Sequence, residues 1–260
     1  MTPQEFHSLI SSCSNILLVV GAGISRSCGI PDFRSPNGLY DQVLDYFPEI
    51  GQPEMFFHID FYREETDLFY SFIQKTFQTL PTQPSNTHFW IKELESQRKL
   101  LRCYTQNIDG LECAAGVTRI IPTHGSLHSA KCLKCSKKCN KSILDLCSPK
   151  ERYCKGKCKG LLKPNIVFFG ERIAEEYFSS IEQDCKSADL LLVVGTSLSV
   201  APINQIVSLV PGETKKIMLN KTLIPGKMHL FDHLVLEDAS EFLRLVKFYS
   251  CTSHTQSDKP

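Results

Sequence analysis

The sequence contains no apolar run long enough to cross a membrane. The run Ile16–Val20 near its start is far shorter than the ~20 residues a membrane helix needs. The first residues show no basic region ahead of an apolar stretch and no arginine-rich amphipathic pattern, so we expect no secretory or transit signal. The formal net charge is only +1, which gives no argument for nucleic-acid binding by the whole chain. We expect residence in the nucleus or the cytoplasm and no membrane partner.

A disulfide framework is also not expected, because the chain is large and shows no secretory signal. It has 12 cysteines, and six of them fall between Cys132 and Cys158. Two close pairs in this segment have the spacing of a four-cysteine zinc site, although the second pair is C-x3-C. No histidine or carboxylate with ligand spacing joins them, which predicts a closed, structural site. Cys139 and Cys147 are competing ligands, and the candidate set is Cys132, Cys135, Cys154 and Cys158.

Short apolar runs without polar alternation predict buried parallel strands, and helix-like stretches such as 175–185 and 239–248 separate them. This alternation predicts an α/β fold with a doubly wound, parallel, Rossmann-like sheet. The predicted strands are Ile16–Val20, Leu101–Thr105, Arg119–Ile121, Leu190–Val194, Lys216–Leu219 and Leu234–Leu236.

Two segments interrupt the alternation. Residues 35–87 are rich in aromatic residues and predict helices packed on an apolar face, and 125–164 carry the cysteines and many lysines. We expect these two insertions to form a smaller unit. The dinucleotide-binding unit is then expected from 1–34, 88–124 and 165–250, with 251–260 as a flexible tail.

Ligands of doubly wound sheets bind beyond the carboxyl ends of the strands. Gly21-Ala22-Gly23 follows the first strand, where glycines allow a tight turn and close approach to a pyrophosphate. A dehydrogenase fingerprint would have a third glycine where Arg26 stands, and an acidic residue after the second strand, where Gln106 stands. Hydride transfer is therefore disfavoured. A tight turn without a ligand is the alternative for this glycine pair taken alone.

Polar residues follow the second and third strands. Asn107 and Asp109 can hydrogen-bond a carboxamide and ribose hydroxyls, or can form a turn that caps the next helix. His124 is the histidine that stands at a strand's carboxyl end, where it can act as a general base near neutral pH. A lone histidine is more often structural, but its position opposite Ser25, Asn107 and Asp109 favours catalysis.

The motifs together resemble the sirtuin family over about residues 14–248. They are G-A-G-I-S at Gly21, G-I-P-D-F-R-S at Gly29, G-L-Y at Gly38, T-Q-N-I-D at Thr105, H-G at His124, the two cysteine pairs, K-P-N-I-V-F-F-G-E at Lys163 and G-T-S at Gly195. The wording S-P-N-G-L-Y is similar to the deacetylase branch. Asn165 stands where an aspartate is common.

The resemblance implies an NAD-dependent protein lysine deacetylase that moves the acyl group to ADP-ribose and releases nicotinamide. It also implies NAD as a consumed co-substrate, one structural Zn²⁺ and His124 as the base, with Asn107 beside it in catalysis. Acyl-lysine would pair with Val167, Phe168, Phe169 and Gly170. The implied NAD contacts are Gly21, Ala22, Gly23, Ser25, Asp32, Phe33, Arg34, Tyr40, Gln106, Asn107, Ile108, Asp109, Gly195, Thr196, Ser197, Asn220, Lys221, Asp238 and Ala239.

Two other functions fit the same residues. A mono-ADP-ribosyltransferase would use the same NAD site with another acceptor, and the segment 167–170 favours deacylation instead. A non-catalytic chromatin-binding scaffold would have a dead site, which the presence of Asn107, Asp109 and His124 argues against.

The segment 131–163 is strongly basic. It holds eleven lysines and arginines against two acids, a net charge of +9, which leaves the remainder of the chain at −8. Four thiolates with one Zn²⁺ carry −2 and offset only part of this charge. The rest is either a solvated face or a surface that docks on chromatin or another acidic partner, and histones are candidate substrates.

Overall fold

The computed structural model describes residues 1–77 and 83–253. Its main element is a six-stranded sheet in the order β3-β2-β1-β7-β8-β9, and every neighbouring pair is parallel. The α/β, doubly wound fold is therefore confirmed. The strands are β1 Ile16–Val20, β2 Leu100–Thr105, β3 Ile120–Pro122, β7 Leu190–Val194, β8 Lys215–Leu219 and β9 His233–Val235.

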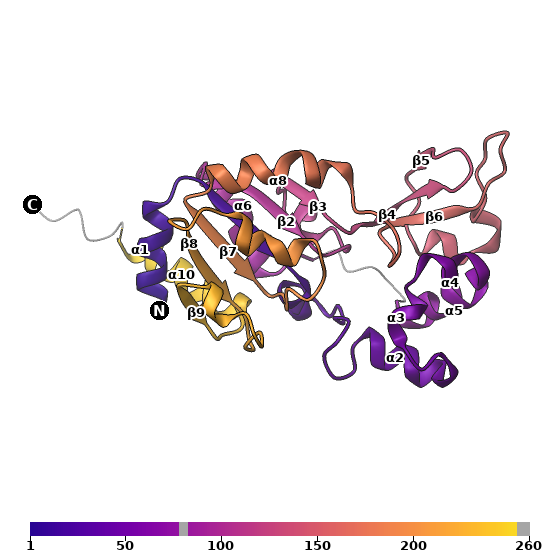
Figure 1. Cartoon of the computed structure of the whole chain (residues 1–260), viewed down its shortest axis with the longest axis horizontal. Helices are drawn as coiled ribbons and strands as arrows, with labels where there is room; N and C mark the ends of the chain where they lie inside the picture. The colour runs from indigo at the N-terminus through magenta and orange to yellow at the C-terminus, as the bar shows by residue number, and fades with distance from the viewer. Residues whose placement is uncertain (78–82, 254–260) are drawn as a thin grey trace, which may run out of the picture.

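Helices cover both faces of this sheet because its strands are apolar on both sides. Side chains of α1 (Pro3–Ser12), α6 (Asn86–Ser96) and α10 (Ala239–Ser253) pack with Ile16, Leu18 and Val20 on one face. Side chains of α8 (Glu175–Ser187) and α9 (Ile206–Leu209) pack with Leu17 and Val19 on the other. Figure 1 shows this layered unit beside a smaller one.

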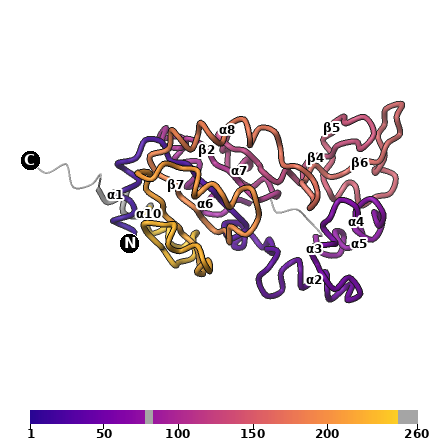
Figure 2. The backbone as a smooth tube through the Cα atoms, viewed as in Figure 1, coloured from indigo at the N-terminus to yellow at the C-terminus, as the bar shows by residue number. Residues whose placement is uncertain are grey.

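The smaller unit combines the two insertions. The first supplies α2 (Leu39–Tyr46), α3 (Pro53–Phe56), α4 (Ile59–Glu64) and α5 (Thr66–Thr76), and the second supplies a three-stranded antiparallel sheet in the order β5-β4-β6. The strands of this sheet are β4 Gly125–Cys132, β5 Lys138–Cys139 and β6 Leu162–Ile166. One hydrophobic cluster joins the aromatic residues of the helices to the small sheet. Figure 2 follows the chain from the large unit to the small one and back.

Some elements were not expected from the sequence. The helix α1 begins with a capping box in which Thr2 and Glu5 bond each other's backbone N–H groups. The small sheet was missed because its strands are short and carry charged residues. The helix α10 continues to Ser253, so residues 251–253 of the predicted tail are helical, and 254–260 lie outside the described residues. Within the described residues, no helix is long and apolar enough to span a bilayer.

The register of the large sheet aligns the residues that follow its strands. Val20 of β1 lies opposite Thr105 of β2 and Val194 of β7. The chain segments after these three residues therefore leave the sheet at one level, on both sides of its central strand. The order of the strands reverses direction here, which is where doubly wound sheets bind ligands.

Candidate active site and metal centre

Two glycine-containing loops meet closely at the end of the central strand. Gly23 N–H donates to the Gly195 carbonyl at 2.8 Å, and Gly21 N–H donates to the Val194 carbonyl at 3.1 Å. A Cβ atom added to Gly23 would lie 2.6 Å from the Gly195 Cα, and one added to Gly21 would lie 2.6 Å from the Thr196 Cβ. No side chain fits at either position, so the two loop backbones pack directly on each other, and no side chain at these positions keeps a phosphate away from the backbone.

Polar side chains of the turn after β2 tie these loops together. Asn107 Nδ2 donates to the Gly21 carbonyl and to Ser25 Oγ, both at 3.2 Å. Gln106 Nε2 donates to Thr196 Oγ1 at 2.9 Å. The sequence-predicted residues Gln106, Asn107 and Ser25 therefore lie together, and Asn107 and Ser25 are buried.

The rest of this turn is fixed by its own backbone. Asp109 Oδ1 accepts from Leu111 N–H at 2.9 Å, as the turn-capping alternative predicts. The Ile108 carbonyl accepts from Leu127 N–H at 2.8 Å, which anchors the turn to β4. His128 Nε2 donates to the Asp109 carbonyl at 2.6 Å. These contacts leave the turn little freedom to move.

The geometry fixes the tautomer of His124. Its Nδ1 lies 2.9 Å from the Gln106 carbonyl, which can only accept, so Nδ1 carries the proton and Nε2 keeps a free lone pair. Burial lowers the pKa of His124 below its ordinary value of 6.5, although the Gln106 carbonyl favours the charged form. The imidazole is thus neutral at physiological pH, with Nε2 available as a base.

The loop from residue 29 to 40 folds on Asp32. This carboxylate accepts from the backbone N–H groups of Arg34 and Ser35 at 3.0 and 2.7 Å, and it pairs with Arg26 at 3.2 Å. Arg34, one of the NAD contacts that the family resemblance implies, is exposed, and its guanidinium group lies over the Tyr40 ring at 5.3 Å from the ring centroid. The cation that pairs with Asp32 is therefore Arg26, and the sequence analysis did not predict this pair.

Aromatic rings line the other end of this loop. Phe33 packs edge-on against Tyr40 at 5.6 Å between ring centroids and against Phe57 at 5.4 Å. Phe33 is only partly buried, while Tyr40 is buried. Ala22 is partly exposed beside the buried Gly21. An apolar ring thus stands at the join between the two units.

A pocket of about 260 Å³ is lined by the chain segments that follow β7 and β8. Ser197 and Asn220, both predicted from the sequence, line it together with Ser199, Lys227 and residues 222–225. Asn220 Nδ2 donates to the Thr222 carbonyl at 2.8 Å, which fixes its orientation. Lys221 is exposed and is not among the lining residues.

The last predicted pair contributes to helix α10. Asp238 Oδ1 accepts from Ser240 N–H at 3.0 Å as a cap, and the Ala239 side chain packs in the core. Their side chains are therefore occupied structurally, and an adenine contact by this pair stays a prediction.

The segment 167–170 bridges the two units. Val167 N–H donates to the His124 carbonyl at 2.8 Å, and Phe169 exchanges backbone hydrogen bonds with Phe57 and Ile59, each at 3.0 Å. The ring of Phe168, a residue that the family resemblance places beside the acyl-lysine, is buried and packs against Tyr62 at 5.0 Å between ring centroids. Phe169 and Gly170 are exposed. A peptide contact with this segment stays a prediction.

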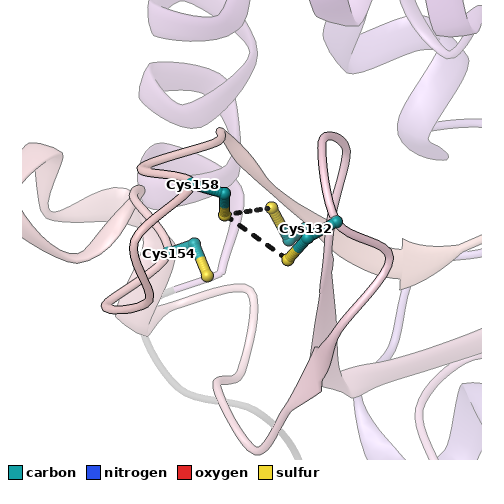
Figure 3. A group of neighbouring side chains, drawn as sticks. Cys132, Cys154 and Cys158 are labelled. Atoms are coloured by element: carbon teal, nitrogen blue, oxygen red, sulfur yellow. Dashed lines mark hydrogen bonds between the residues drawn. The ribbon is translucent and has the colours of Figure 1, made fainter.

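The four predicted cysteines converge between β4 and the loop that precedes β6. Their sulfur atoms all lie within 4.8 Å of one another, and Cys158 Sγ is 3.7 Å from Cys132 Sγ and 3.4 Å from Cys135 Sγ. Figure 3 shows three of these residues labelled. A tetrahedral zinc with bonds of ~2.3 Å places its sulfurs ~3.8 Å apart, so the spacing fits. Cys139 and Cys147 are outside this group.

Sequence reasoning missed a buried acid beneath the site. Glu112 of α7 (Leu111–Ala114) is fully buried, and its Oε1 accepts from Thr105 Oγ1 at 2.6 Å. His88 of α6 is also fully buried. The available signal was the three-residue spacing of Asp109 and Glu112 across a turn, and that spacing alone predicts no function.

Comparisons with known proteins agree with this geometry. The model of the Sir2 family matches residues 21–202. The NAD-dependent protein deacetylase sir-2.1 of Caenorhabditis elegans is 39% identical over 84% of this chain and 36% of its own length. The NAD-dependent histone deacetylase sirtuin-1 of Drosophila melanogaster is 38% identical over 85% of this chain and 30% of its own length.

A solved structure described as "Sir2-p53 peptide-NAD+" superimposes with a TM-score of 0.82 at 29% identity. The match covers 97% of this chain and 100% of that one. The chain spans about a third of the length of the two curated relatives above. The similarity therefore covers the sheet, the small unit and the cysteine group, and leaves the remainder of those relatives without a counterpart here.

The cysteine group predicts a measurable metal content. Purified protein should hold about one zinc per chain, because four thiolates at this spacing form a closed site whose metal stabilises the fold. Cys132→Ser should lose the zinc and lower the melting temperature, whereas Cys147→Ser, a partly buried cysteine outside the group, should keep the metal. Mass-spectrometric metal analysis checks both. A folded, metal-free wild type would contradict the assignment.

Proposed function

The chain belongs to the Sir2 family, and we propose from this that it is an NAD-dependent protein lysine deacetylase. The observation that carries the proposal is the placement of a free base beside a set of strand-end amides. His124 Nε2 has its lone pair available, and the same Gln106 whose carbonyl orients it also bonds Thr196 across the sheet. Its relatives carry the same activity in their names.

The residues fit NAD along the carboxyl ends of the strands. The two glycines add no side chain to this edge, so a pyrophosphate could approach the backbone closely, with Ser25, Asp32, Phe33, Arg34 and Tyr40 around the nicotinamide ribose. Asn107 and Asp109 would contact the nicotinamide, beside Gln106 and Ile108. The pocket lined by Ser197 and Asn220 suits the adenosine half, with Gly195, Thr196, Lys221, Asp238 and Ala239 as its remaining proposed contacts.

NAD would supply an electrophilic ribose carbon to which the acyl oxygen adds as nicotinamide leaves. One water molecule would then release the lysine amine, so that the acyl group ends on ADP-ribose. His124 would take the proton of a ribose hydroxyl at Nε2, which is possible because Nδ1 is held by the Gln106 carbonyl. Asn107 would orient the ribose from its fixed position next to Ser25. Phe33 at the join of the two units would exclude water from the reacting carbon.

The substrate fits as an acyl-lysine in an extended peptide. It would lie along Val167, Phe168, Phe169 and Gly170, where the backbone already bridges the two units. A neutral acyl-lysine can enter an apolar passage, whereas the product ammonium would be buried without a partner at high cost. This difference favours release of the deacylated lysine.

Removing the base should abolish most of the activity. His124→Ala should lower kcat on an acetyl-lysine peptide by about 10²–10⁴-fold, the usual contribution of a general base. NAD and peptide affinities should change little, because Nε2 acts on a proton and does not anchor either ligand. Steady-state kinetics and calorimetry check this. Near-full turnover by the variant would refute the role of His124.

The pH profile should show the lowered pKa of His124. The neutral imidazole is the active form, so kcat/KM should fall as the pH drops through its pKa. Because burial lowers that pKa, the midpoint of the acid limb should lie below pH 6.5. Measuring kcat/KM from pH 5 to 9 checks the direction. A midpoint well above 6.5 would show that another group controls the acid limb.

Mono-ADP-ribosyl transfer is the second candidate, because it would use the same NAD site. It needs a nucleophilic acceptor in place of acyl-lysine, and the bridging segment 167–170 favours the peptide substrate. A non-catalytic scaffold would not require the Nδ1 proton of His124 to be fixed by the Gln106 carbonyl, as it is here.

We also propose acyl-lysine proteins of chromatin, histones among them, as partners, and the nucleus as the place of action. The name of the fruit-fly relative supports this. The basic residues of 131–163 in the small unit fall into two groups, those in ion pairs and those that are exposed. Arg152, Lys163 and Lys141 are paired with Asp67, Glu171 and Glu151, which removes them from the free surface charge. The remaining basic residues are all exposed: Lys131, Lys134, Lys137, Lys138, Lys150, Lys155, Lys157 and Lys159.

Neutralising part of this lysine surface should weaken docking alone. Changing Lys137, Lys138, Lys155 and Lys157 to Gln should reduce nucleosome binding at low salt, because contacts with DNA phosphates release counterions. Activity on a short acetyl peptide should not change. The matched control changes the exposed Arg98, Lys186, Lys215 and Arg244 of the large unit to Gln. Equal binding by both variants across a salt series would leave the lysines as solvated surface.

A further inference from the structure

A cluster of buried polar side chains lies under the proposed nicotinamide site. The cluster consists of three residues: His88 of α6, Asp109 of the turn after β2, and Glu112 of α7. One side-chain nitrogen or oxygen atom of each lies within 4.8 Å of those of the other two. His88 and Glu112 are 0% exposed and Asp109 is 6% exposed. Neither His88 nor Glu112 has a part in the chemistry proposed above, yet burying two such groups is costly.

Glu112 is linked to Asn107 through one hydroxyl group. Thr105 Oγ1 donates to Glu112 Oε1 at 2.6 Å and accepts from Asn107 N–H at 3.0 Å. A hydroxyl has a single proton, so the bond to Glu112 orients the Thr105 lone pair toward Asn107. The Asn107 side chain then reaches Ser25 and the Gly21 carbonyl. The Glu112 carboxyl group thus helps to fix the start of the turn after β2.

His88 is linked through Ser85 to the loop that follows β1. Its Nδ1 accepts from Ser85 N–H at 3.0 Å, so the proton of the neutral ring is on Nε2. Ser85 Oγ donates to the carbonyl of Ile24, the residue before Ser25, at 2.9 Å. The loop after β1 is therefore attached to the buried cluster through Ser85, and the turn after β2 is attached to the same cluster through Thr105.

Two atoms in this cluster show no hydrogen-bond partner among the described residues, namely His88 Nε2 and Glu112 Oε2. Buried polar atoms are nearly always paired, and unpaired ones tend to mark functional constraint. Burial, with the nearby Asp109 carboxylate, raises the pKa of Glu112 to about 7, and burial lowers the pKa of His88 to about 4. Both shifts favour uncharged groups, which disfavours a divalent cation here because its carboxylate ligands must be ionised.

We propose that Glu112 is a positioning residue that acts through Thr105 to set Asn107 against the nicotinamide end of NAD, with His88 holding the facing loop. The proposal rests on the proposed NAD site, since Asn107 is where its effect would be felt. It assigns to Glu112 a hydrogen-bonding role and no charge, so an amide of the same shape should replace it.

Four variants separate this role from general stability. Glu112→Leu removes both carboxyl oxygens, Thr105→Val breaks the link and leaves Glu112 in place, and the third variant combines them. Glu112→Gln keeps an acceptor for Thr105 and is the conservative control. For each, calorimetry gives the Kd for NAD and for an acetyl-lysine peptide, kinetics gives kcat and KM for both, and thermal melting reports folding.

We expect Glu112→Leu and Thr105→Val to weaken NAD binding and lower kcat/KM for NAD by at least about tenfold, the effect of one displaced site residue. The peptide Kd should stay within about twofold, because the cluster lies under the NAD side only. Glu112→Gln should stay within about threefold of wild type. The double variant should lose no more NAD affinity or kcat/KM than the more impaired of the two single variants, because both changes break the same chain of hydrogen bonds.

Three results would overturn the proposal. They are a folded Glu112→Leu or Thr105→Val protein with wild-type NAD parameters, strictly additive effects in the double variant, or an equal loss of NAD and peptide affinity. If Glu112→Leu does not fold, Thr105→Val decides alone. A wild type that binds NAD but leaves acyl peptides intact would refute the deacetylase function, while the NAD Kd values would still judge the role of Glu112.

Discussion

The close contact between the Gly23 and Gly195 backbones is the constraint on which the site depends. It joins the loop after β1 to the loop after β7 at the point where the strand order reverses. Because any Cβ at Gly23 would collide with backbone atoms, the contact requires glycine there, and Gly195 also has a φ of 62° that side chains disfavour. The result is a stretch of backbone that carries no side chain at these two positions, with Gln106, Asn107 and His124 beside it.

The site also depends on the fixed orientation of the polar side chains near this edge. Each polar side chain there has a partner that sets its orientation: the Gln106 carbonyl for His124, Ser25 for Asn107, and Thr196 for the Gln106 amide. These partners come from three different strand ends. Pre-organisation of this kind lets a weak base act with little reorganisation during the reaction. The buried His88 and Glu112 extend the same logic one layer deeper.

Much of the fold was predictable from the sequence. Uninterrupted apolar runs such as Leu190–Val194 marked the parallel strands, and the residues after them included Asn107 and His124. The four cysteines were predictable because zinc ligands follow a local spacing rule. The partner of Asp32 and the packing of Phe168 were not predictable, since both depend on how loops from distant segments fold back. Glu112 was missed because only the tertiary structure shows that it is buried.

In the proposed reaction, the acyl group of a lysine is transferred to ADP-ribose with consumption of NAD. The most direct test is to incubate the purified protein with NAD and an acetyl-lysine peptide and to identify all products by mass spectrometry. We predict nicotinamide, deacetylated peptide and acetyl-ADP-ribose in equal amounts, as this acyl transfer requires. Consumption of NAD with ADP-ribose attached to protein and the acetyl peptide unchanged would contradict it.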